Sequence, residues 1–398
     1  MRNIEKRILM YQDFEILSFE IDFEKEAIRI IKKLAHFDKA PKIILECNDS
    51  EMMSIALQRF IGRRYIPNSR TDYQEILEAT GFSSGFELSF QAHGLAIFDH
   101  FWYKREGEEL HYKDINFFTN KWDDSFAKAV LAQDYKALRN CDLNVPDLTT
   151  SGWGIKGWIY EVDGPKLFKL GINKDHSEEA IGEVLASRIA KRLFNEGEVL
   201  QYELRKVGDR YASVSPVIVN ADEDLVPLAE YIDGKTHMLY LNINRDKDLA
   251  KEFYESIKNS NIPGLYEFFV KVACFRDLCF VSDLHFDNIS LITNNKTERI
   301  RIAPLYDFGS SFGCSRTGQS FLANSNKSTA LLVYYLFSSL NPDWDYTWYD
   351  PNKLIGVEDE IKEFLSKSDF YTPELIDVIL QVYKTQKEDL DNMAKSNS

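Results

Sequence analysis

Alternating and helical spacings of hydrophobic residues divide the first part of the chain into short elements. Partial alternation over residues 7–22, interrupted by a Gln-Asp pair, predicts a β-hairpin. Apolar residues recur at helical spacing in three stretches, which predict helices over residues 27–35, 52–60 and 71–81. A capping-box spacing at Thr71 marks the start of the last helix. A short apolar run at residues 43–45 predicts a strand before the second helix.

In the second half of the chain, hairpins and longer helices follow one another. Residues 158–162 and 166–172 flank an Asp-Gly turn and predict a hairpin. Helical spacing predicts a helix from Ser177, its capping residue, to Phe194. Residues 289–306 predict a second hairpin around a polar turn. Three stretches near the end predict further helices, over residues 331–340, 356–366 and 373–393.

Aromatic residues gather between the early helices and the first of these later hairpins. The group comprises Phe98, Phe101, Trp102, Tyr103, Tyr112, Phe117, Phe118 and Trp122. Because large aromatic side chains are mostly buried in globular domains, we interpret the group as part of an α+β core rather than as a binding surface. Residues 137–151 lack periodicity and are rich in turn formers, which predicts a connection between domains.

The composition is that of an ordinary globular protein and excludes several classes. The 398 residues, 44% hydrophobic and 28% charged, suggest two or three domains, each with its own core. The net charge of −15 disfavours binding to nucleic acid or anionic lipid, because such binding depends on neutralising phosphates. Five cysteines without paired spacing argue against zinc and suit free thiols. Charges near the start stand where a signal peptide needs apolar residues, and the longest apolar run, near residues 329–340, is too short to span a bilayer. We therefore expect a cytoplasmic protein.

A glycine-rich segment gives the first chemical signal. Gly152, Gly154 and Gly157 fit the GxGxxG spacing, which dinucleotide folds, kinases and plain turns share. A dinucleotide site needs a strand before this loop and a helix after it. Here a predicted hairpin follows instead, and that order is typical of kinases that bind nucleotides.

A lysine and a glutamate follow the loop in the order that kinases use. Lys169 lies in the second hairpin strand between apolar neighbours, and Glu183 lies in the next helix beside small residues. In protein kinases such a glutamate orients the lysine that binds phosphate. The alternatives are a solvated lysine on the outer face of the hairpin and an ordinary surface glutamate on the helix.

The strongest signal lies further along the chain. Asp283 and Asn288 are five residues apart, which is the spacing of a kinase catalytic loop. One predicted hairpin later, Asp307 begins an Asp-Phe-Gly (DFG) sequence, whose carboxylate binds Mg²⁺ in kinases. The tripeptide alone could arise by chance. Its position after this loop, with Lys169 and Glu183 upstream in order, makes the combination specific.

At these residues the sequence resembles the HipA-like protein kinase family of bacterial toxin-antitoxin systems. The segment from Asp283 to Asn288, with His285 inside it, matches the family's D-x-H-x-x-N catalytic loop. The segment Ala303-Pro-Leu-Tyr-Asp307 matches its A-P-x-Y-D metal strand. The resemblance covers most of residues 147–310.

The resemblance implies a two-lobed, protein-kinase-like α+β fold with a mainly helical C-terminal lobe and an additional N-terminal α/β subdomain. Residues 1–146 would form that subdomain, whose role is unknown. Residues 147–235 would form the nucleotide-binding lobe, and residues 236–398 the helical lobe with the catalytic loop and the DFG sequence. In the subdomain, residues 64–70 and 112–118 are similar to the front half of a compact, fused subset of the family.

The resemblance also implies roles for individual residues. Asp283 would be the catalytic base, and Asn288 and Asp307 would hold Mg²⁺. Lys169 would contact the phosphates of ATP. The nucleotide site would further include Ser151, Gly152, Gly154, Lys156, Glu183, Glu230, Tyr231, Ile232, His285 and Tyr306, with the backbone of residues 229–232 pairing with adenine. Ser151 is a candidate for autophosphorylation, although Gly-Trp-Gly departs from the family's commoner Gly-Ala-Gln-type loop.

The expected activity is therefore transfer of the ATP γ-phosphoryl group to a serine or threonine of a protein. ATP and Mg²⁺ are the expected cofactors, and a protein substrate and an antitoxin or regulator protein are the expected partners, with no direct contact to nucleic acid or membrane. The protein would then be the toxin of a toxin-antitoxin system. A small-molecule or phosphoinositide-type kinase, a catalytically silent nucleotide-binding module and a structural interaction protein remain as alternatives.

Overall fold

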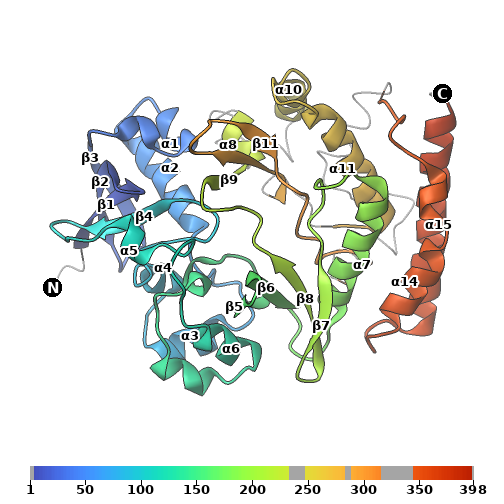
Figure 1. Cartoon of the computed structure of the whole chain (residues 1–398), viewed down its shortest axis with the longest axis horizontal. Helices are drawn as coiled ribbons and strands as arrows, with labels where there is room; N and C mark the ends of the chain where they lie inside the picture. Colours follow the sequence, from blue (N-terminus) through green and yellow to red (C-terminus); the bar gives the residue numbers. More distant parts are fainter. Residues whose placement is uncertain (1–3, 233–246, 283–287, 315–343, 397–398) are drawn as a thin grey trace. The chain divides into compact units, whose positions relative to one another are not determined.

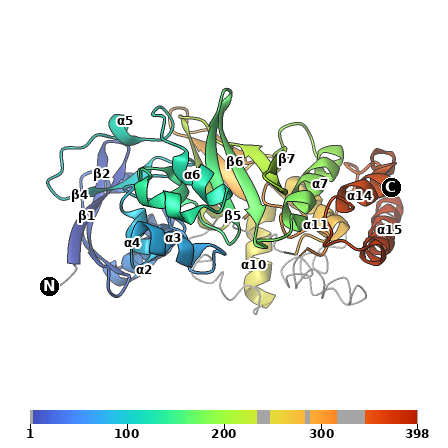
Figure 2. The same cartoon turned by 90° about the horizontal axis from the view of Figure 1, so that it is seen from below.

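The computed structural model describes residues 4–232, 247–282, 288–314 and 344–396, which form two compact units (Figures 1 and 2). The first unit contains residues 1–172, 216–225 and 293–298. The second contains residues 173–215, 226–292 and 299–398. The boundary expected near residue 147 falls inside the first unit, and the division into three domains stays a prediction.

An antiparallel sheet opens the first unit. Its strands are β1 (Ile4–Tyr11), β2 (Phe14–Asp22), β3 (Ala27–Lys33) and β4 (Phe101–Arg105), in the order β3-β2-β1-β4. β1 and β2 meet across the turn at Gln12 and Asp13, with Leu9 opposite Leu17. This confirms the hairpin predicted from the alternation in residues 7–22.

Two of the early predictions are wrong. Residues 27–33 form strand β3, not a helix, because Ile28 and Ile30 are buried while Ala27, Arg29 and Ile31 between and beside them are exposed. This alternation, in a segment rich in β-branched residues, lets the strand pair with β2 and bury one face. The helical spacing of the isoleucines was therefore misleading.

The short apolar run at residues 43–45 forms helix α1 (Lys42–Leu45), not a strand. Pro41 precedes it, where a missing N–H breaks no helical hydrogen bond. Ile43 and Ile44 are both buried. In a strand, two successive side chains would point to opposite faces, whereas one turn of helix buries both against the same core.

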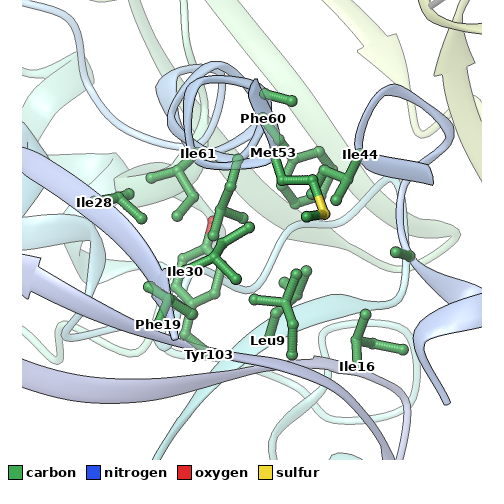
Figure 3. Close-up of a cluster of buried hydrophobic side chains, with 14 of the residues drawn as sticks. Leu9, Ile16, Phe19, Ile28, Ile30, Ile44, Met53, Phe60, Ile61 and Tyr103 are labelled. Carbon is green, nitrogen blue, oxygen red and sulfur yellow. The ribbon is translucent and has the colours of Figure 1, made fainter. Parts of the chain in front are cut away.

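Helix α2 (Ser50–Gly62) covers one face of the sheet, as Figure 3 shows. Met53, Phe60 and Ile61 of the helix pack over Leu9, Ile16, Phe19, Ile30 and Tyr103, and all of these side chains are buried. The helix begins at Asp49, whose side chain accepts a hydrogen bond from the N–H of Met52 at 2.8 Å. The helix predicted over residues 52–60 is confirmed.

Short helices complete the first unit. They are α3 (Tyr73–Thr80), α4 (Gly85–Ser89), α5 (Tyr112–Ile115) and α6 (Ser125–Leu131), with 3₁₀ turns at Phe37–Lys39, Tyr135–Asn140 and Pro146–Thr149. α3 ends at Gly81, where φ is +78°, as its position after the helical spacing predicted. The capping box at Thr71 does not form, because Asp72 is the residue that precedes the helix. The hydroxyl of Thr71 instead donates to the carbonyl of Ile172 at 2.9 Å.

Most of the aromatic residues between 98 and 122 belong to the core, as predicted, while Phe98, Phe101 and Phe118 are only partly buried. Trp102, Tyr103, Tyr112, Phe117 and Trp122 are buried. All five cysteines are free thiols, as their spacing predicted. Among the described residues, no helix has the length and apolar composition needed to cross a membrane.

A buried charged pair fastens residues 216–225 to the rest of the first unit. Nδ1 of His100 lies 2.6 Å from the carboxylate of Asp224, and Nε2 lies 2.9 Å from the carbonyl of Ala221. A carboxylate and a carbonyl can only accept, so this geometry favours the imidazolium form, which has a proton on each ring nitrogen. The hydroxyl of Tyr11 donates to the same carboxylate at 2.6 Å. Burial alone would lower the pKa of His100, but the hydrogen bond and charge of Asp224 outweigh it and raise this pKa.

We expect this pair to make stability depend on pH. An unfolded histidine titrates near pH 6.5, and His100 in the folded protein has a higher pKa. The resulting stabilisation is complete below about pH 6.5 and is lost as the pH rises through the pKa of folded His100. Wild type should be about 3 kcal/mol more stable than His100→Gln at pH 6, and less so at pH 9. Urea unfolding of both proteins at the two pH values measures this. An advantage that stays constant or grows with pH would contradict the assignment.

A hairpin of β5 (Ile155–Glu161) and β6 (Gly164–Gly171) also belongs to the first unit and confirms the prediction from the Asp-Gly turn. In its register Lys156 lies opposite Lys169. Directly opposed residues in an antiparallel pair point to the same face. The hairpin therefore presents two lysines on one side.

The second unit combines short strands with most of the longer helices. Its strands are β7 (Glu203–Val207) and β8 (Arg210–Pro216), which form a hairpin, and β11 (Ile300–Ile302). β9 (Glu223–Pro227) and β10 (Ser290–Asn294) contain residues of both units, and β10 lies between β9 and β11. The hairpin of β10 and β11 was predicted from residues 289–306.

Most helices of the second unit pack together around α7 (Glu178–Leu193) and α11 (Leu265–Cys279), as Figures 1 and 2 show. The others are α8 (Leu228–Ile232), α10 (Lys247–Lys258), α14 (Val357–Leu365) and α15 (Pro373–Ser396), with a 3₁₀ turn at Pro351–Leu354. Arg192 of α7 forms an ion pair of 2.6 Å with Glu360 of α14. The helices predicted over residues 177–194, 356–366 and 373–393 are confirmed as α7, α14 and α15, and the one predicted over residues 331–340 lies outside the described residues.

Candidate active site

The DFG sequence lies in the second unit, and hydrogen bonds from its backbone fix it. The N–H of Asp307 donates to the hydroxyl of Tyr202 at 3.1 Å. The N–H of Phe308 donates to a carboxylate oxygen of Glu183 at 3.2 Å. Asp307 has a φ of +66°, in the left-handed region that side chains other than glycine rarely adopt. Such strain persists only where the surroundings hold it, and it is concentrated at functional sites.

The glutamate of the predicted lysine–glutamate pair is buried. Glu183 lies on α7 with 1% of its surface exposed, which excludes the alternative of a surface glutamate. Its second carboxylate oxygen accepts a hydrogen bond from the hydroxyl of Ser213 on β8. The carboxylate thus ties α7 both to β8 and to the DFG backbone.

Helix α7 also approaches the chain just after the DFG sequence. A Cβ added at Gly182 would lie 3.0 Å from the hydroxyl and 3.4 Å from the carbonyl oxygen of Ser311. The absence of a side chain at residue 182 therefore allows this close packing. The small residues noted around Glu183 in the sequence suit the same close approach.

The phenylalanine of the DFG sequence is a packing anchor. Phe308 is fully buried, with its ring 5.4 Å from that of Phe275 on α11 and 5.9 Å from that of Tyr202. Both contacts have the edge-to-face geometry that aromatic pairs favour. The same tyrosine therefore contacts Phe308 with its ring and Asp307 with its hydroxyl.

Other contacts join the segment near the catalytic loop to the DFG region. The N–H and the hydroxyl of Ser282 both donate to the carbonyl of Ser310, at 3.2 and 3.1 Å. The hydroxyls of Ser290 and Tyr306 are 2.9 Å apart. Asn288 is buried, with 8% of its surface exposed. Asp283 and His285 lie outside the described residues.

The residues expected to pair with adenine form part of α8. Glu230 in this short helix is buried, and Tyr231 is partly buried. Ile232 ends the helix. Pairing between this backbone and adenine stays a prediction.

In the first unit, the glycine-rich loop closes around a lysine. The ammonium of Lys156 donates to the carbonyl of Ser151 at 2.7 Å. Gly152 has a φ of +104°, and a Cβ there would collide with the Lys156 ammonium. A Cβ at Gly154 would lie 2.9 Å from the backbone of Gly171 at the end of β6. The first two glycines of the motif are therefore required by close packing and, at residue 152, by the backbone conformation.

The loop and its hairpin place two positive charges on one face. Lys156 is buried, whereas Lys169, between buried Phe168 and Leu170, is partly exposed. The side chains of Ser151 and Trp153 are exposed, and Trp153 has 58% of its surface accessible. Two ammonium groups near a loop with exposed residues suit an anionic ligand such as a polyphosphate.

The predicted residues thus fall into two sets, each within one unit. Ser151, Gly152, Gly154, Lys156 and Lys169 belong to the first unit. The set in the second unit comprises Glu183, Glu230, Tyr231, Ile232, Asn288, Tyr306 and Asp307. Sequence reasoning missed Tyr202 and Ser213, which contact the DFG region and Glu183, because neither belongs to a recognisable motif.

Two residues of the second unit have the chemistry of a magnesium site. Among the described residues, no three histidine, cysteine, aspartate or glutamate side chains form a cluster that could hold a metal ion. Mg²⁺ needs no such cluster, because one or two protein oxygens suffice when phosphates and water complete its octahedron. The carboxylate of Asp307 and the amide oxygen of Asn288 are oxygen donors of the kind that Mg²⁺ prefers.

No family model matches the sequence, and no curated protein matches it. Two solved structures are similar to this chain. HipA of Shewanella oneidensis MR-1, from the structure of its toxin-antitoxin complex with HipB and operator DNA, matches with a TM-score of 0.56. The likeness covers 98% of this chain and 99% of HipA, at 14% sequence identity. This chain has the HipA fold. The α+β, protein-kinase-like architecture implied by the sequence motifs is thereby confirmed.

A second solved structure is similar to part of this chain. The proinflammatory kinase CtkA of Helicobacter pylori matches with a TM-score of 0.42 and 13% identity, covering 61% of this chain and 94% of CtkA.

Proposed function

We propose that this chain is a Mg²⁺-dependent kinase that transfers the γ-phosphoryl group of ATP to a serine or threonine of a protein. The observation that carries the proposal is the anchored DFG sequence, with Glu183 accepting from the N–H of Phe308 and Tyr202 accepting from that of Asp307. A chance tripeptide would not be expected to form a hydrogen bond with Glu183, the glutamate that the order of the motifs indicates. The HipA fold over nearly the whole chain supports the same conclusion.

Each group would act by position and charge. Lys156 and Lys169 would bind the phosphates, and Asn288 and Asp307 would hold Mg²⁺. Bound Mg²⁺ would neutralise charge on the phosphates and fix their orientation. Asp283 would accept the proton of the attacking hydroxyl. Because the chemistry needs little more than alignment and electrostatic stabilisation, the fixed backbone around Asp307 is what such a site requires.

A protein partner is part of this proposal. HipA was solved together with HipB and operator DNA, and we propose that this chain likewise acts in the cytoplasm with an antitoxin or regulator protein. With a net charge of −15, the chain itself is poorly suited to bind the phosphate backbone of DNA. Any link to DNA would then pass through the partner.

The proposal is tested by incubating wild type and Asp283→Ala with Mg²⁺ and γ-labelled ATP and mapping phosphosites by mass spectrometry. We expect label on the wild type and none on the variant. The exposed side chain of Ser151 is the site where autophosphorylation is expected first. Label on both proteins would contradict the role of Asp283. A wild type that binds MgATP but transfers no phosphate to protein would favour a small-molecule kinase or a silent binding module.

A further inference from the structure

The segment around Arg70, which has no assigned chemistry, directly contacts the phosphate loop, the glycine-rich segment of residues 151–157 that runs into β5. The guanidinium of Arg70 donates to the carbonyl of Lys156 at 3.0 Å. The N–H of Thr71 donates to the carbonyl of Trp153 at 2.9 Å. Two successive residues from an early part of the chain thus hold two backbone carbonyls of the loop.

Arg70 is itself fixed by a buried ion pair. Its Nε lies 2.7 Å from the carboxylate of Asp72, and the two side chains are 1% and 0% exposed. A buried guanidinium is costly unless it is paired and hydrogen-bonded. Its planar fork can satisfy a carboxylate and a carbonyl together, which a lysine ammonium cannot do with the same geometry.

Thr71 joins the two ends of the hairpin. Its N–H holds Trp153 before β5, and its hydroxyl donates to the carbonyl of Ile172 just after β6, at 2.9 Å. The glycine loop and the end of the lysine strand are therefore tied to the same residue. This is a function for the Thr71 hydroxyl in place of the helix cap that the sequence predicted.

The segment that carries Arg70 and Thr71 packs closely against α4. A Cβ at Gly85 of α4 would collide with the carbonyl of Ile66. The N–H of Gly85 donates to the hydroxyl of Tyr73 at 3.0 Å, just after Asp72. The segment from residue 66 to residue 73 thus rests on α4 at both ends, which leaves Arg70 and Thr71 little freedom.

We infer that Arg70 and Thr71 are positioning residues that set the affinity for ATP by holding the phosphate loop in its binding conformation. The inference rests on the proposed function. Arg70 and Thr71 fix the carbonyls of Lys156 and Trp153. This keeps the Lys156 ammonium hydrogen-bonded to the carbonyl of Ser151 and next to Gly152, in the conformation that we infer binds phosphate. A loop held in this way loses little conformational entropy on binding, whereas a loosened loop must be ordered by ATP.

The test compares Arg70→Lys and Thr71→Val with Arg64→Lys as a matched control. Arg64 is equally buried, pairs with Asp99 and donates to the carbonyls of Gly94 and Phe101, but these lie outside the phosphate loop. Each protein is assayed for the MgATP dissociation constant by calorimetry, for kcat and KM of ATP, and for melting temperature.

Arg70→Lys should raise the MgATP dissociation constant and the KM of ATP about tenfold each. Its kcat at saturating ATP should stay within about threefold of wild type. Thr71→Val, which keeps the backbone N–H, should raise the MgATP dissociation constant and the KM of ATP about threefold. Arg64→Lys should lower the melting temperature without changing either constant. If Arg70→Lys does not fold, the MgATP affinity of Thr71→Val tests the inference alone.

Unchanged MgATP affinity in the folded Arg70 and Thr71 variants of an active enzyme would overturn this inference and leave the proposed function standing. An equal loss of affinity in Arg64→Lys would also overturn it, because the effect would then come from general destabilisation. A wild type that neither binds MgATP nor transfers phosphate would overturn the proposed function and the inference together.

Discussion

Asp307→Asn is expected to lower kcat about 10³-fold while the protein stays folded. The expected loss follows from removing the charge that would hold Mg²⁺ against the phosphates. Asparagine tolerates the left-handed backbone that residue 307 adopts, and its N–H can still donate to Tyr202. The free energy of unfolding should therefore change by no more than about 1 kcal/mol.

The measurement is the initial rate of phosphoryl transfer at saturating MgATP, combined with urea unfolding. Asp359→Asn, on the exposed surface of α14, makes the same change in net charge away from the site and serves as the control. A tenth or more of the wild-type rate in Asp307→Asn would rule out this aspartate as a metal ligand.

Substitutions of Glu183 should separate its charge from its hydrogen bonds. Glu183→Gln keeps an oxygen that can accept from the N–H of Phe308, and the hydroxyl of Ser213 can turn to accept from the new amide. Only the charge that would orient Lys169 is lost. We expect kcat/KM to fall about 10²-fold with little change in melting temperature.

Glu183→Ala, by contrast, removes both hydrogen bonds. The N–H of Phe308 would then be buried without its acceptor, and a cavity would open at a side chain that is 1% exposed. The expected cost is about 3 kcal/mol of unfolding free energy in addition to the loss of activity. Thermal unfolding and kinetics of both variants test this. Wild-type kcat/KM in Glu183→Gln would show that the carboxylate charge plays no part in catalysis.

The sequence predicted correctly those elements that depend only on residues close together in the chain. Gly81 ends α3, and the Asp-Gly turn closes the hairpin of β5 and β6, because each depends on a few neighbouring residues. Strand β3 and helix α1 were predicted wrongly, since their short isoleucine-rich segments fit either structure. Pairing with β2 and burial against α2 decide between the two, and neither is visible in a short window of sequence.

The candidate site was predicted to the extent that motif order determines it. The order of Lys169, Glu183, Asn288 and Asp307 identified the glutamate that accepts from the DFG backbone. It could not identify Tyr202, which contacts the DFG sequence, or Arg70, which contacts the glycine-rich loop, because both contacts arise from packing between segments that are distant in the sequence. Their roles follow from geometry, since a tyrosine hydroxyl or an arginine fork makes such contacts only in the folded chain.

The most direct test of the account is a crystal structure of the protein with Mg²⁺ and a non-hydrolysable ATP analogue. We expect Mg²⁺ at about 2.1 Å from the carboxylate of Asp307 and the amide oxygen of Asn288. The phosphates should contact the ammonium groups of Lys156 and Lys169. A bound nucleotide whose metal has neither Asp307 nor Asn288 as a ligand would contradict the assignment of this chain as a kinase of the HipA fold.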